Sequence, residues 1–418
     1  MMRYLIAILF FSITISGNSV YSQNETSGGS AYSIFGIGDL SYYSSTRTYA
    51  MGILGTSLTG NYINSFNPAA ITKLRSTLIS TNFNYGFLKS SNDISENKVS
   101  NGNVLGINIG IPFDQGRGWV LGLGFNPASL INYKIRIQNS IGGANYNQTY
   151  SGSGGLSRIN FGMSYNLLRK INIGLEYNYS FGEIKNLNYI DFNNSSYTNS
   201  LIKKETDFQK SYIKAGLILE AGKLFNSIAL RNLNIGFVYQ SGFNLNSTLD
   251  GIYISSTSVD TVRLKEGEIE IPDSYSFGIT NNFGGKYIVS ADIILQDWSK
   301  FRDFGKKIDN FGSSYRAGLG IEILPSRTNN SFWGRNTYRI GGFYDKAYYT
   351  VSGMDILTYG IRAGLNIPIS KYNSLDFGIN YSVKGKTSDG LIKDEFLNLT
   401  AGVNFGELWF LRPNEEDK

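Results

Sequence analysis

The chain has 418 residues, a formal net charge of +6, and neither Cys nor His. Without thiols and imidazoles there is no Cys-His or Ser-His nucleophile and no thiolate or imidazole metal site, so we expect neither an enzyme nor a cofactor. The Lys and Arg residues are scattered without a basic block, which argues against a nucleic-acid partner, whereas 29 Tyr and 26 Phe favour strands.

Residues 1–22 have the pattern of a secretory signal peptide. Met1–Arg3 supplies a positive start, Leu5–Ile15 is apolar, and the residues at −3 and −1 favour cleavage near Ser22 or Gln23. The apolar run is shorter than the roughly 20 residues that a spanning helix needs. No later segment approaches that length of uninterrupted apolar sequence. The mature chain is therefore predicted to be exported, either as a secreted protein or as an outer-membrane barrel.

Residues 23–73 show no alternation of apolar and polar residues. A linker, Asn24–Ser30, precedes about forty apolar and small residues, and Asn67-Pro68-Ala69 is expected to open a short helix that Asn67 caps. A disordered tail would explain only the linker. Inside a barrel the lumen is the natural place for the rest, so we predict an N-terminal plug, or hatch, over residues 23–73.

Strict alternation characterises the remainder of the chain, residues 74–412. In Ile171–Phe181 the bulky apolar residues occupy one face of the strand, and the other face carries Asn, Gly, Glu and Ser. Four further clear runs are Thr77–Phe87, Tyr287–Leu295, Leu375–Val383 and Leu397–Phe405. Weaker candidates are Asn103–Ile111, Gly118–Phe125, Ile131–Ile137, Leu156–Asn166, Phe208–Leu219, Leu233–Gln240, Ser274–Asn282, Tyr315–Ile323, Tyr338–Tyr349 and Ile356–Ile367. Apolar residues outside and polar residues inside are typical of a membrane barrel.

Single-chain bacterial barrels have an even number of strands, but the candidates number fifteen. Either one candidate is false or two belong to one bent strand, and the suspected pair is Gly118–Phe125 and Ile131–Ile137, which flank Asn126-Pro127. We therefore predict an all-β fold, a transmembrane antiparallel β-barrel of about 14 strands. A secreted sandwich or propeller is disfavoured because the chain lacks a repeat of fixed length.

The lengths of the connections between strands indicate which end of the barrel faces the periplasm. Leu168–Lys170 and Phe283–Lys286 are tight turns of the periplasmic kind, and Ser140–Gly155, Gly182–Asp207 and Asn246–Pro272 are predicted as long extracellular loops. Within the last of them, residues 262–271 could form an extra hairpin edge or simply be solvated by their charges. The expected location is the outer membrane of a Gram-negative type of cell, with both termini periplasmic.

The C-terminal strand ends in Phe405 after strict alternation, which resembles the signal that the outer-membrane insertion machinery reads. Trp409 and Phe410 are expected to complete a periplasmic aromatic girdle, and residues 413–418 form a polar periplasmic tail. The expected partners here are outer-membrane lipid and the insertion machinery. A charge on the lipid face is costly, so Phe405→Asp is predicted to abolish insertion.

Several motifs resemble those of the long-chain fatty-acid transport (FadL) family of outer-membrane barrels. Arg47–Gly52, containing Met51-Gly52, then Gly55–Leu58 and Asn67-Pro68-Ala69 resemble its N-terminal hatch. Pro272 to Gly278 resembles a strand start of that family, and Asp297-Trp298-Ser299 resembles the strand end that follows. Tyr315–Gly318 and Tyr338–Gly341 resemble its later Tyr-Arg-x-Gly strand starts. Ile53 replaces the second Gly of the family's hatch, and the C-terminal third looks like a divergent FadL-like branch.

This resemblance implies passive uptake of hydrophobic compounds such as long-chain fatty acids through a plugged lumen. Leu78 and Ile294 break the polar-inside pattern and would either line an apolar path or contact the plug. Arg316, Arg339 and Arg362 would either bind a charged headgroup or pair with the acidic candidates Glu176, Asp292 and Asp376. An alternative function from another class is a non-transporting barrel subunit of an outer-membrane protein secretion or assembly complex, whose partner is another outer-membrane protein.

Overall fold

The alternating runs form strands whose apolar side chains point away from the barrel and whose polar side chains point into it. In β7 (Ile171–Phe192) Leu175 and Tyr177 are exposed, whereas Glu176 and Asn178 between them are buried. This arrangement is the reverse of a soluble domain and gives the barrel an apolar outer surface that faces lipid. The computed structural model describes residues 28–114, 116–141, 144–192, 198–255, 258–326 and 331–409. The predicted signal peptide and its predicted cleavage position at Ser22 and Gln23 lie outside these ranges, as do Phe410 and the predicted tail.

The described strands other than β7 are, in chain order, β1 (Asp39–Leu40), β2 (Thr77–Ser91), β3 (Glu96–Asp114), β4 (Trp119–Pro127), β5 (Ser129–Ile141), β6 (Ala144–Leu167), β8 (Ser200–Glu220), β9 (Leu233–Gln240), β10 (Phe243–Ile254), β11 (Val259–Ile271), β12 (Ser274–Phe283), β13 (Tyr287–Asp297), β14 (Arg302–Asp303), β15 (Lys306–Lys307), β16 (Ser313–Ile323), β17 (Thr337–Val351), β18 (Met354–Pro368), β19 (Ser374–Gly385) and β20 (Lys393–Glu407). The helices are η1 (Ala31–Ile34), α2 (Thr46–Ala50), η2 (Pro68–Lys73), α3 (Ala221–Leu224), η3 (Trp298–Lys300) and η4 (Trp333–Arg335). None of these helices is both long and apolar enough to cross a membrane.

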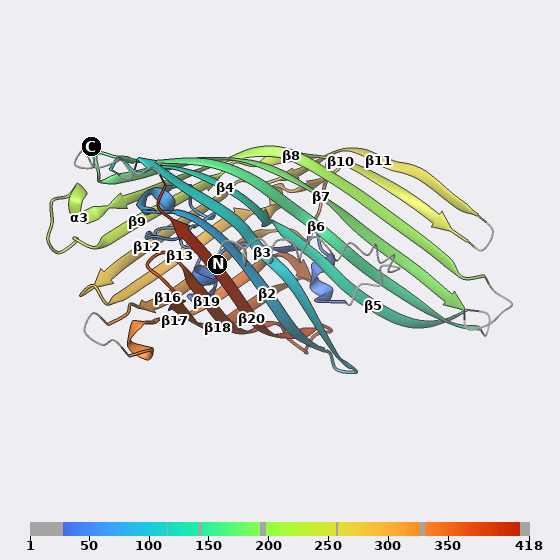
Figure 1. The fold of residues 1–418 in the computed structure, drawn as a ribbon. Coiled ribbons are helices and arrows are strands. Elements are labelled where there is room, and N and C mark those ends of the chain that lie inside the picture. Colours follow the sequence, from blue (N-terminus) through green and yellow to red (C-terminus); the bar gives the residue numbers. More distant parts are fainter. Residues whose placement is uncertain are drawn as a thin grey trace, which may run out of the picture.

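Fourteen antiparallel strands close the barrel, as predicted (Figure 1). Each pairs with its neighbours along the chain, and β20 closes the circle by pairing with β2. Three of the fourteen are bent and consist of two segments. Of these, β4 and β5 both pair with β6, so the two suspected candidates are one bent strand. In the same way β10 continues β9 along β8, and β11 continues into β12 at Pro272, which has no N–H for the ladder.

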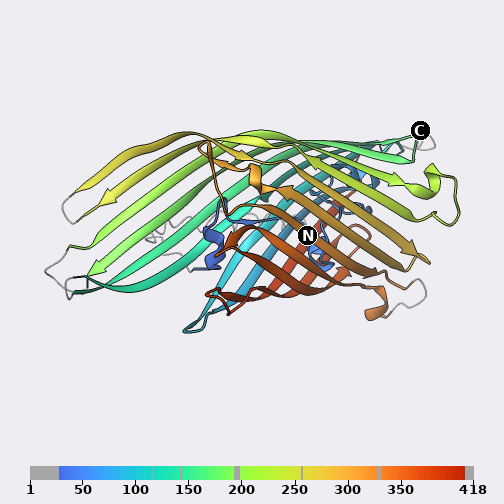
Figure 2. The same ribbon diagram turned by 180° about the vertical axis from the view of Figure 1, so that it is seen from behind.

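One side of the barrel extends far beyond the other at the end opposite the short turns (Figures 1 and 2). The strands β6, β7 and β8 have 24, 22 and 21 residues, although about 9–11 residues span a bilayer. The three predicted long loops are therefore wrong in large part, because β6, β7, β8, β10 and β11 run through them. Residues 262–271 likewise belong to a strand, β11, paired along its length with β10. Above the membrane both faces of a strand meet water, so the apolar alternation that marks a strand disappears there.

The wall has a discontinuity between the upper half of β3 and β5, which we call the β3–β5 seam. Among the described residues, β5 pairs with β6 and with β1 but not with β3. Residues 28–40 occupy the seam. Asn101 of β3 donates from its side chain to the carbonyl of Gly28 (3.1 Å), and the Asn132 N–H of β5 donates to Ser33 Oγ (3.1 Å). The chain's own N-terminal residues thus close the seam. The N-terminus itself lies outside the described residues, so its periplasmic location stays a prediction.

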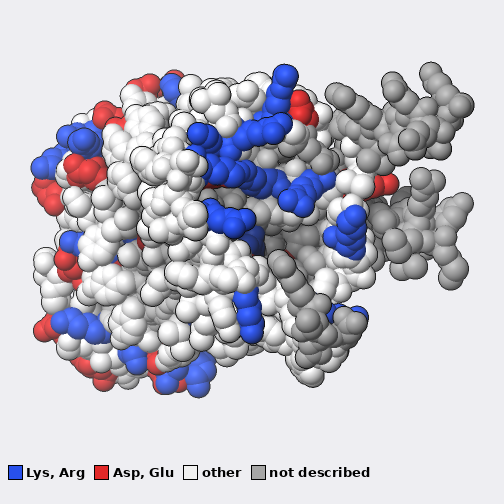
Figure 3. Space-filling view, turned by 90° about the vertical axis from the view of Figure 1, so that its left-hand side faces the viewer, with Lys and Arg blue, Asp and Glu red and all other residues white. Residues whose placement is uncertain are grey.

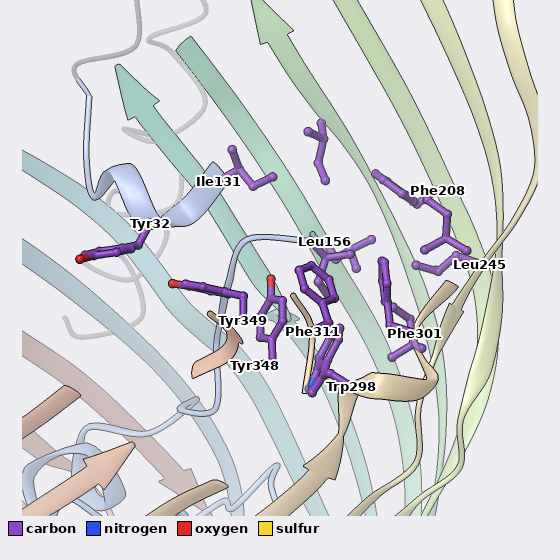
Figure 4. Close-up of a cluster of buried hydrophobic side chains, with 14 of the residues drawn as sticks. Tyr32, Ile131, Leu156, Phe208, Leu245, Trp298, Phe301, Phe311, Tyr348 and Tyr349 are labelled. Atoms are coloured by element: carbon purple, nitrogen blue, oxygen red, sulfur yellow. The ribbon is translucent and has the colours of Figure 1, made fainter. Parts of the chain in front are cut away.

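A cluster of aromatic and aliphatic side chains fills the lumen towards the long-strand end (Figure 4). Tyr32 comes from η1, Trp298 from η3, and Tyr348 and Tyr349 from β17. Trp298 stacks on Tyr348 with ring centroids 4.2 Å apart. Burying these rings removes apolar surface from water and so packs the lumen closed at this level.

Candidate functional site

The plug, residues 28–73 as described, lies inside the barrel and contacts the wall on several sides. Its helix η2 begins at Pro68 and is capped by Asn67, whose side chain accepts the Ala69 N–H, so the predicted short helix is confirmed as a 3₁₀ turn. This helix lies against β4, β6, β7 and β8, and a second plug helix, α2, lies against β17 to β20. Thr46 of α2 donates from its N–H and its hydroxyl to Asn82 Oδ1 of β2 (2.9 Å each).

Inward-facing glycines of the wall let the plug backbone approach closely. A Cβ on Gly341 would stand 1.9 Å from the Met51 carbonyl oxygen, and one on Gly318 would stand 2.3 Å from that of Gly52. Gly52 itself has a φ of +70°, in the left-handed region that favours glycine. The two Tyr-Arg-x-Gly motifs and the Met51-Gly52 motif therefore meet in space, as the wall and the plug sides of one contact.

A chain of buried charges joins α2 to three wall strands. Arg47 forms an ion pair with Glu322 of β16, Glu322 accepts from Arg339 of β17 (2.8 Å), and Arg339 pairs with Asp376 of β19. Burial alone would lower the pKa of the Arg47 guanidinium, but the Glu322 carboxylate raises it above its usual range, so the pair stays charged. Asp376 also accepts from Asn404 (2.6 Å). Each of these four linked side chains has a partner of opposite charge, as buried ions require.

Two of the predicted arginines contact tyrosines of the plug. Arg316 donates to Tyr43 Oη (2.6 Å) and pairs with Asp345 (2.9 Å). Arg362 donates to the Tyr49 carbonyl (3.2 Å), and its guanidinium carbon lies 3.9 Å from the centroid of the Tyr49 ring. These arginines have protein partners on the plug side of the lumen.

The two remaining acidic candidates also contact the plug. The Asp292 carboxylate accepts the N–H groups of Leu54 (3.1 Å), Gly55 (2.7 Å) and Thr56 (3.2 Å). Glu176 pairs with Lys214 (2.9 Å), which also donates to the carbonyl of the plug residue Ser65 (3.2 Å). Of the predicted arginine–carboxylate pairs, the structure contains Arg339 with Asp376.

Leu78 and Ile294, the two apolar residues predicted for the inner face, pack against apolar plug residues. Leu78 clusters with Ile63, Ile71 and Leu74. Ile294 clusters with Leu54 and Phe66. The sequence left open whether these residues line an apolar path or contact the plug. In the structure both contribute to a contact with the plug.

The remaining predicted residues lie away from this network. Pro272 is the bend between β11 and β12, and Trp298 and Ser299 form η3, whose Ser299 hydroxyl donates to Asp297 (2.7 Å). Phe405 is exposed on the lipid face and Trp409 is exposed beyond the end of β20. Sequence reasoning missed Arg47, Lys214 and Glu322 as lumenal charges. The two wall residues among them, Lys214 and Glu322, sit at inward positions of alternating runs, which is the signal that could have found them.

Two cavities lie in the lumen beside the plug. The first measures about 80 Å³ and is lined by apolar plug residues such as Ile37 and Phe66 together with Ile294 and Trp298. The second measures about 230 Å³, and Arg316, Asp345, Arg362 and Lys384 are among its lining residues. A cavity of about 150 Å³ with apolar walls is known to hold benzene. The first cavity is smaller than that, and the second is strongly charged.

Comparison with known proteins gives a family and a fold. The family model described as BamG matches residues 1–414. Among solved structures, a Pseudomonas aeruginosa FadL homologue is similar with a TM-score of 0.59 at 12% identity, covering 87% of this chain and 98% of that one. The Ralstonia pickettii toluene transporter TbuX (TM-score 0.56, 15% identity, 88% and 99% covered) and the Pseudomonas putida toluene transporter TodX (0.56, 16%, 89% and 100%) are similar too. Comparison with curated proteins gives no match. The FadL resemblance is thereby confirmed for the fold.

Proposed function

Because the chain belongs to the BamG family, we propose that it is a non-transporting barrel subunit of an outer-membrane protein assembly complex of the Bam type. The observation that carries this proposal is the family match over nearly the whole chain, which covers the plug and every wall strand. The likeness to hydrocarbon and fatty-acid barrels is limited to the fold, at 12–16% identity. Fold alone does not carry a substrate with it.

The anchoring of the plug supports the same proposal. A hatch that moves during transport has to break its contacts with the wall and reform them. Here the Arg47–Glu322 ion pair, the three N–H donors to Asp292 and the Lys214 contact with Ser65 attach the plug to β16, β13 and β8. Leaving a buried charge without its partner costs about 3–5 kcal/mol, so displacing the plug from Glu322 and from these hydrogen bonds together is energetically unfavourable.

The lumen and the wall also offer little to a hydrophobic solute. Of the two cavities beside the plug, the one of about 80 Å³ is smaller than a cavity that holds benzene, and the one of about 230 Å³ is lined by opposite charges. The β3–β5 seam, where a solute could leave sideways, is filled by residues 28–40. A barrel that keeps its lumen filled is suited to a role at its outer surfaces.

The test is gentle purification from the native outer membrane. A tag placed in the exposed β2–β3 hairpin, near Ile94, allows extraction in mild detergent followed by quantitative mass spectrometry. We expect other Bam subunits at near-stoichiometric amounts, and we expect depletion of the chain to lower the amounts of other outer-membrane barrels. An unrelated porin with the same tag is the control.

Transport is measured on the same preparation. Reconstituted into planar bilayers or liposomes, the purified barrel is expected to pass neither ions nor toluene nor a fatty acid at rates above empty liposomes. A barrel that purifies alone and carries a hydrophobic molecule in its lumen would overturn the assembly proposal in favour of transport.

A further inference from the structure

The short-turn end of the barrel carries an excess of positive charge. Four neighbouring segments of this end, residues 68–76, 114–118, 167–171 and 220–232, hold seven Lys and Arg and two carboxylates. We call the surface they form the basic end face, and its Lys and Arg are Lys73, Arg75, Arg117, Arg169, Lys170, Lys223 and Arg231. Figure 3, which looks onto this end, shows Lys and Arg gathered over the middle of the face.

Backbone contacts hold these segments side by side. The Asn166 N–H donates to the Arg117 carbonyl (2.9 Å), and the Glu220 N–H donates to the Lys170 carbonyl (2.9 Å). Lys223 Nζ donates to the Arg169 carbonyl (3.3 Å). Of the two carboxylates, Glu220 is already paired with Lys73 and Lys223. The cations of the neighbouring turns are therefore fixed close together, where their potentials add.

Large apolar side chains project from the same turns. Leu168 is 74% exposed, Phe225 is 64% exposed and Ile228 is 91% exposed. Leu168 and Arg169 also have φ values of +53° and +58°. Two successive residues with positive φ in a turn are normally Asn-Gly, because branched and long residues are sterically disfavoured there. The turn thus presents a leucine and an arginine to solvent against the local preference of the backbone.

From this combination we propose that the basic end face docks the acidic surface of a soluble periplasmic domain. The inference rests on the proposed function, because that domain belongs to another subunit of the same assembly complex. Short turns mark the periplasmic end of a bacterial barrel. An interface combines apolar anchors with charges that steer and orient the partner. Lys73 of the plug helix η2 contributes to this face together with the wall turns, so the face extends from the rim over the end of the lumen, which favours a protein over phospholipid headgroups.

The test compares two variants of equal charge change in complexes purified from native membranes. Arg117→Gln, Arg169→Gln and Lys170→Gln together remove three exposed cations from the basic end face. Lys204→Gln, Lys306→Gln and Lys307→Gln remove three exposed lysines elsewhere. We expect the amount of one acidic soluble subunit that copurifies with the first variant to fall roughly tenfold, while the membrane-embedded subunits are retained. The second variant is expected to retain all of them.

Crosslinking identifies the contact directly. A photo-crosslinking amino acid in place of Ile228 is expected to capture that same acidic subunit. The same amino acid in place of Ile94, which is 94% exposed in the β2–β3 hairpin, is expected not to. Full retention of every soluble subunit by the end-face variant, or crosslinks from position 228 to phospholipid alone, would overturn the docking inference. A wild-type barrel that purifies without any Bam subunit would instead overturn the proposed function.

Discussion

At the scale of single residues, the ion pair of Arg47 with Glu322 is a buried contact between the plug and the wall. Arg47→Met removes one partner and leaves the buried Glu322 carboxylate with Arg339 alone. Removing one member of a buried pair costs about 3–5 kcal/mol, and the retained Arg339 places the expected loss of unfolding free energy at the lower end. The midpoint of urea-induced unfolding in lipid vesicles measures it.

The matched control for that change is an exposed ion pair. Lys386 and Asp389 are both about half exposed, so water screens their attraction, and Lys386→Met is expected to leave the unfolding midpoint unchanged. Equal shifts in the two variants would show that the Arg47 pair contributes no more than a surface pair.

A second prediction concerns Phe405. It pairs with Ile79 two residues from the end of β20, close to the membrane interface, where a charge on the lipid face costs about 1 kcal/mol or less. Loss of barrel formation in Phe405→Asp would therefore come mainly from the loss of an aromatic assembly signal. We expect Phe405→Asp to lack the heat-modifiable band of a folded barrel on electrophoresis and Phe405→Tyr to keep it. A normal band for the Asp variant would contradict the signal role.

The sequence reveals which residues face the lumen but not how they pair. Alternation of apolar and polar residues places Arg316, Arg339 and Glu322 on inner faces. The sequence of each strand by itself is enough for this prediction. Arg47 and Glu322 are 275 positions apart, so their contact depends on the register of the whole barrel and on how deep the plug sits. Those two quantities are set by packing, which no local pattern encodes.

At the scale of elements, the inward glycines of the wall and the plug backbone form one fitted contact. Gly341→Ala would place a Cβ 1.9 Å from the Met51 carbonyl oxygen, so the plug has to shift away from β17. We expect faster cleavage of residues 28–73 by added protease in detergent and a lower melting temperature. Gly312→Ala is the control, because a Cβ there meets nothing within 4 Å and its φ is not positive. Equal protease resistance in both variants would show that the close approach is not needed.

The elements inside the bilayer were predictable, whereas those beyond it were not. In β7 the alternation ends at Phe181, but the strand continues to Phe192. Beyond Phe181 the outward residues include Glu183 and Lys185, which water solvates equally well on a strand or in a loop. Hydrogen bonds to β6 and β8 maintain the strand there, and those depend on neighbours that the sequence does not identify.

At the scale of the whole molecule, the β3–β5 seam makes the N-terminal residues part of the permeability barrier. Deleting residues 24–35 removes η1 and the contacts of Gly28 and Ser33. We expect the deletion variant to conduct ions in planar bilayers, whereas the full chain stays silent. Removing Asp93 and Ile94 from the exposed β2–β3 hairpin is the control and is expected not to conduct. Equal silence in both variants would mean that other elements close the seam.

The plug also touches both strands of the closing pair, which has a consequence for the order of folding. Thr46 donates to Asn82 of the first wall strand, and its hydroxyl oxygen lies 2.9 Å from where a Cβ on Gly402 of the last wall strand would stand. A segment held on all sides by a finished cylinder cannot be threaded in afterwards without undoing those contacts. The plug residues, which are exported before the wall strands, must therefore remain unpaired until the last strand is in place. They then act as the template on which the first and last wall strands pair.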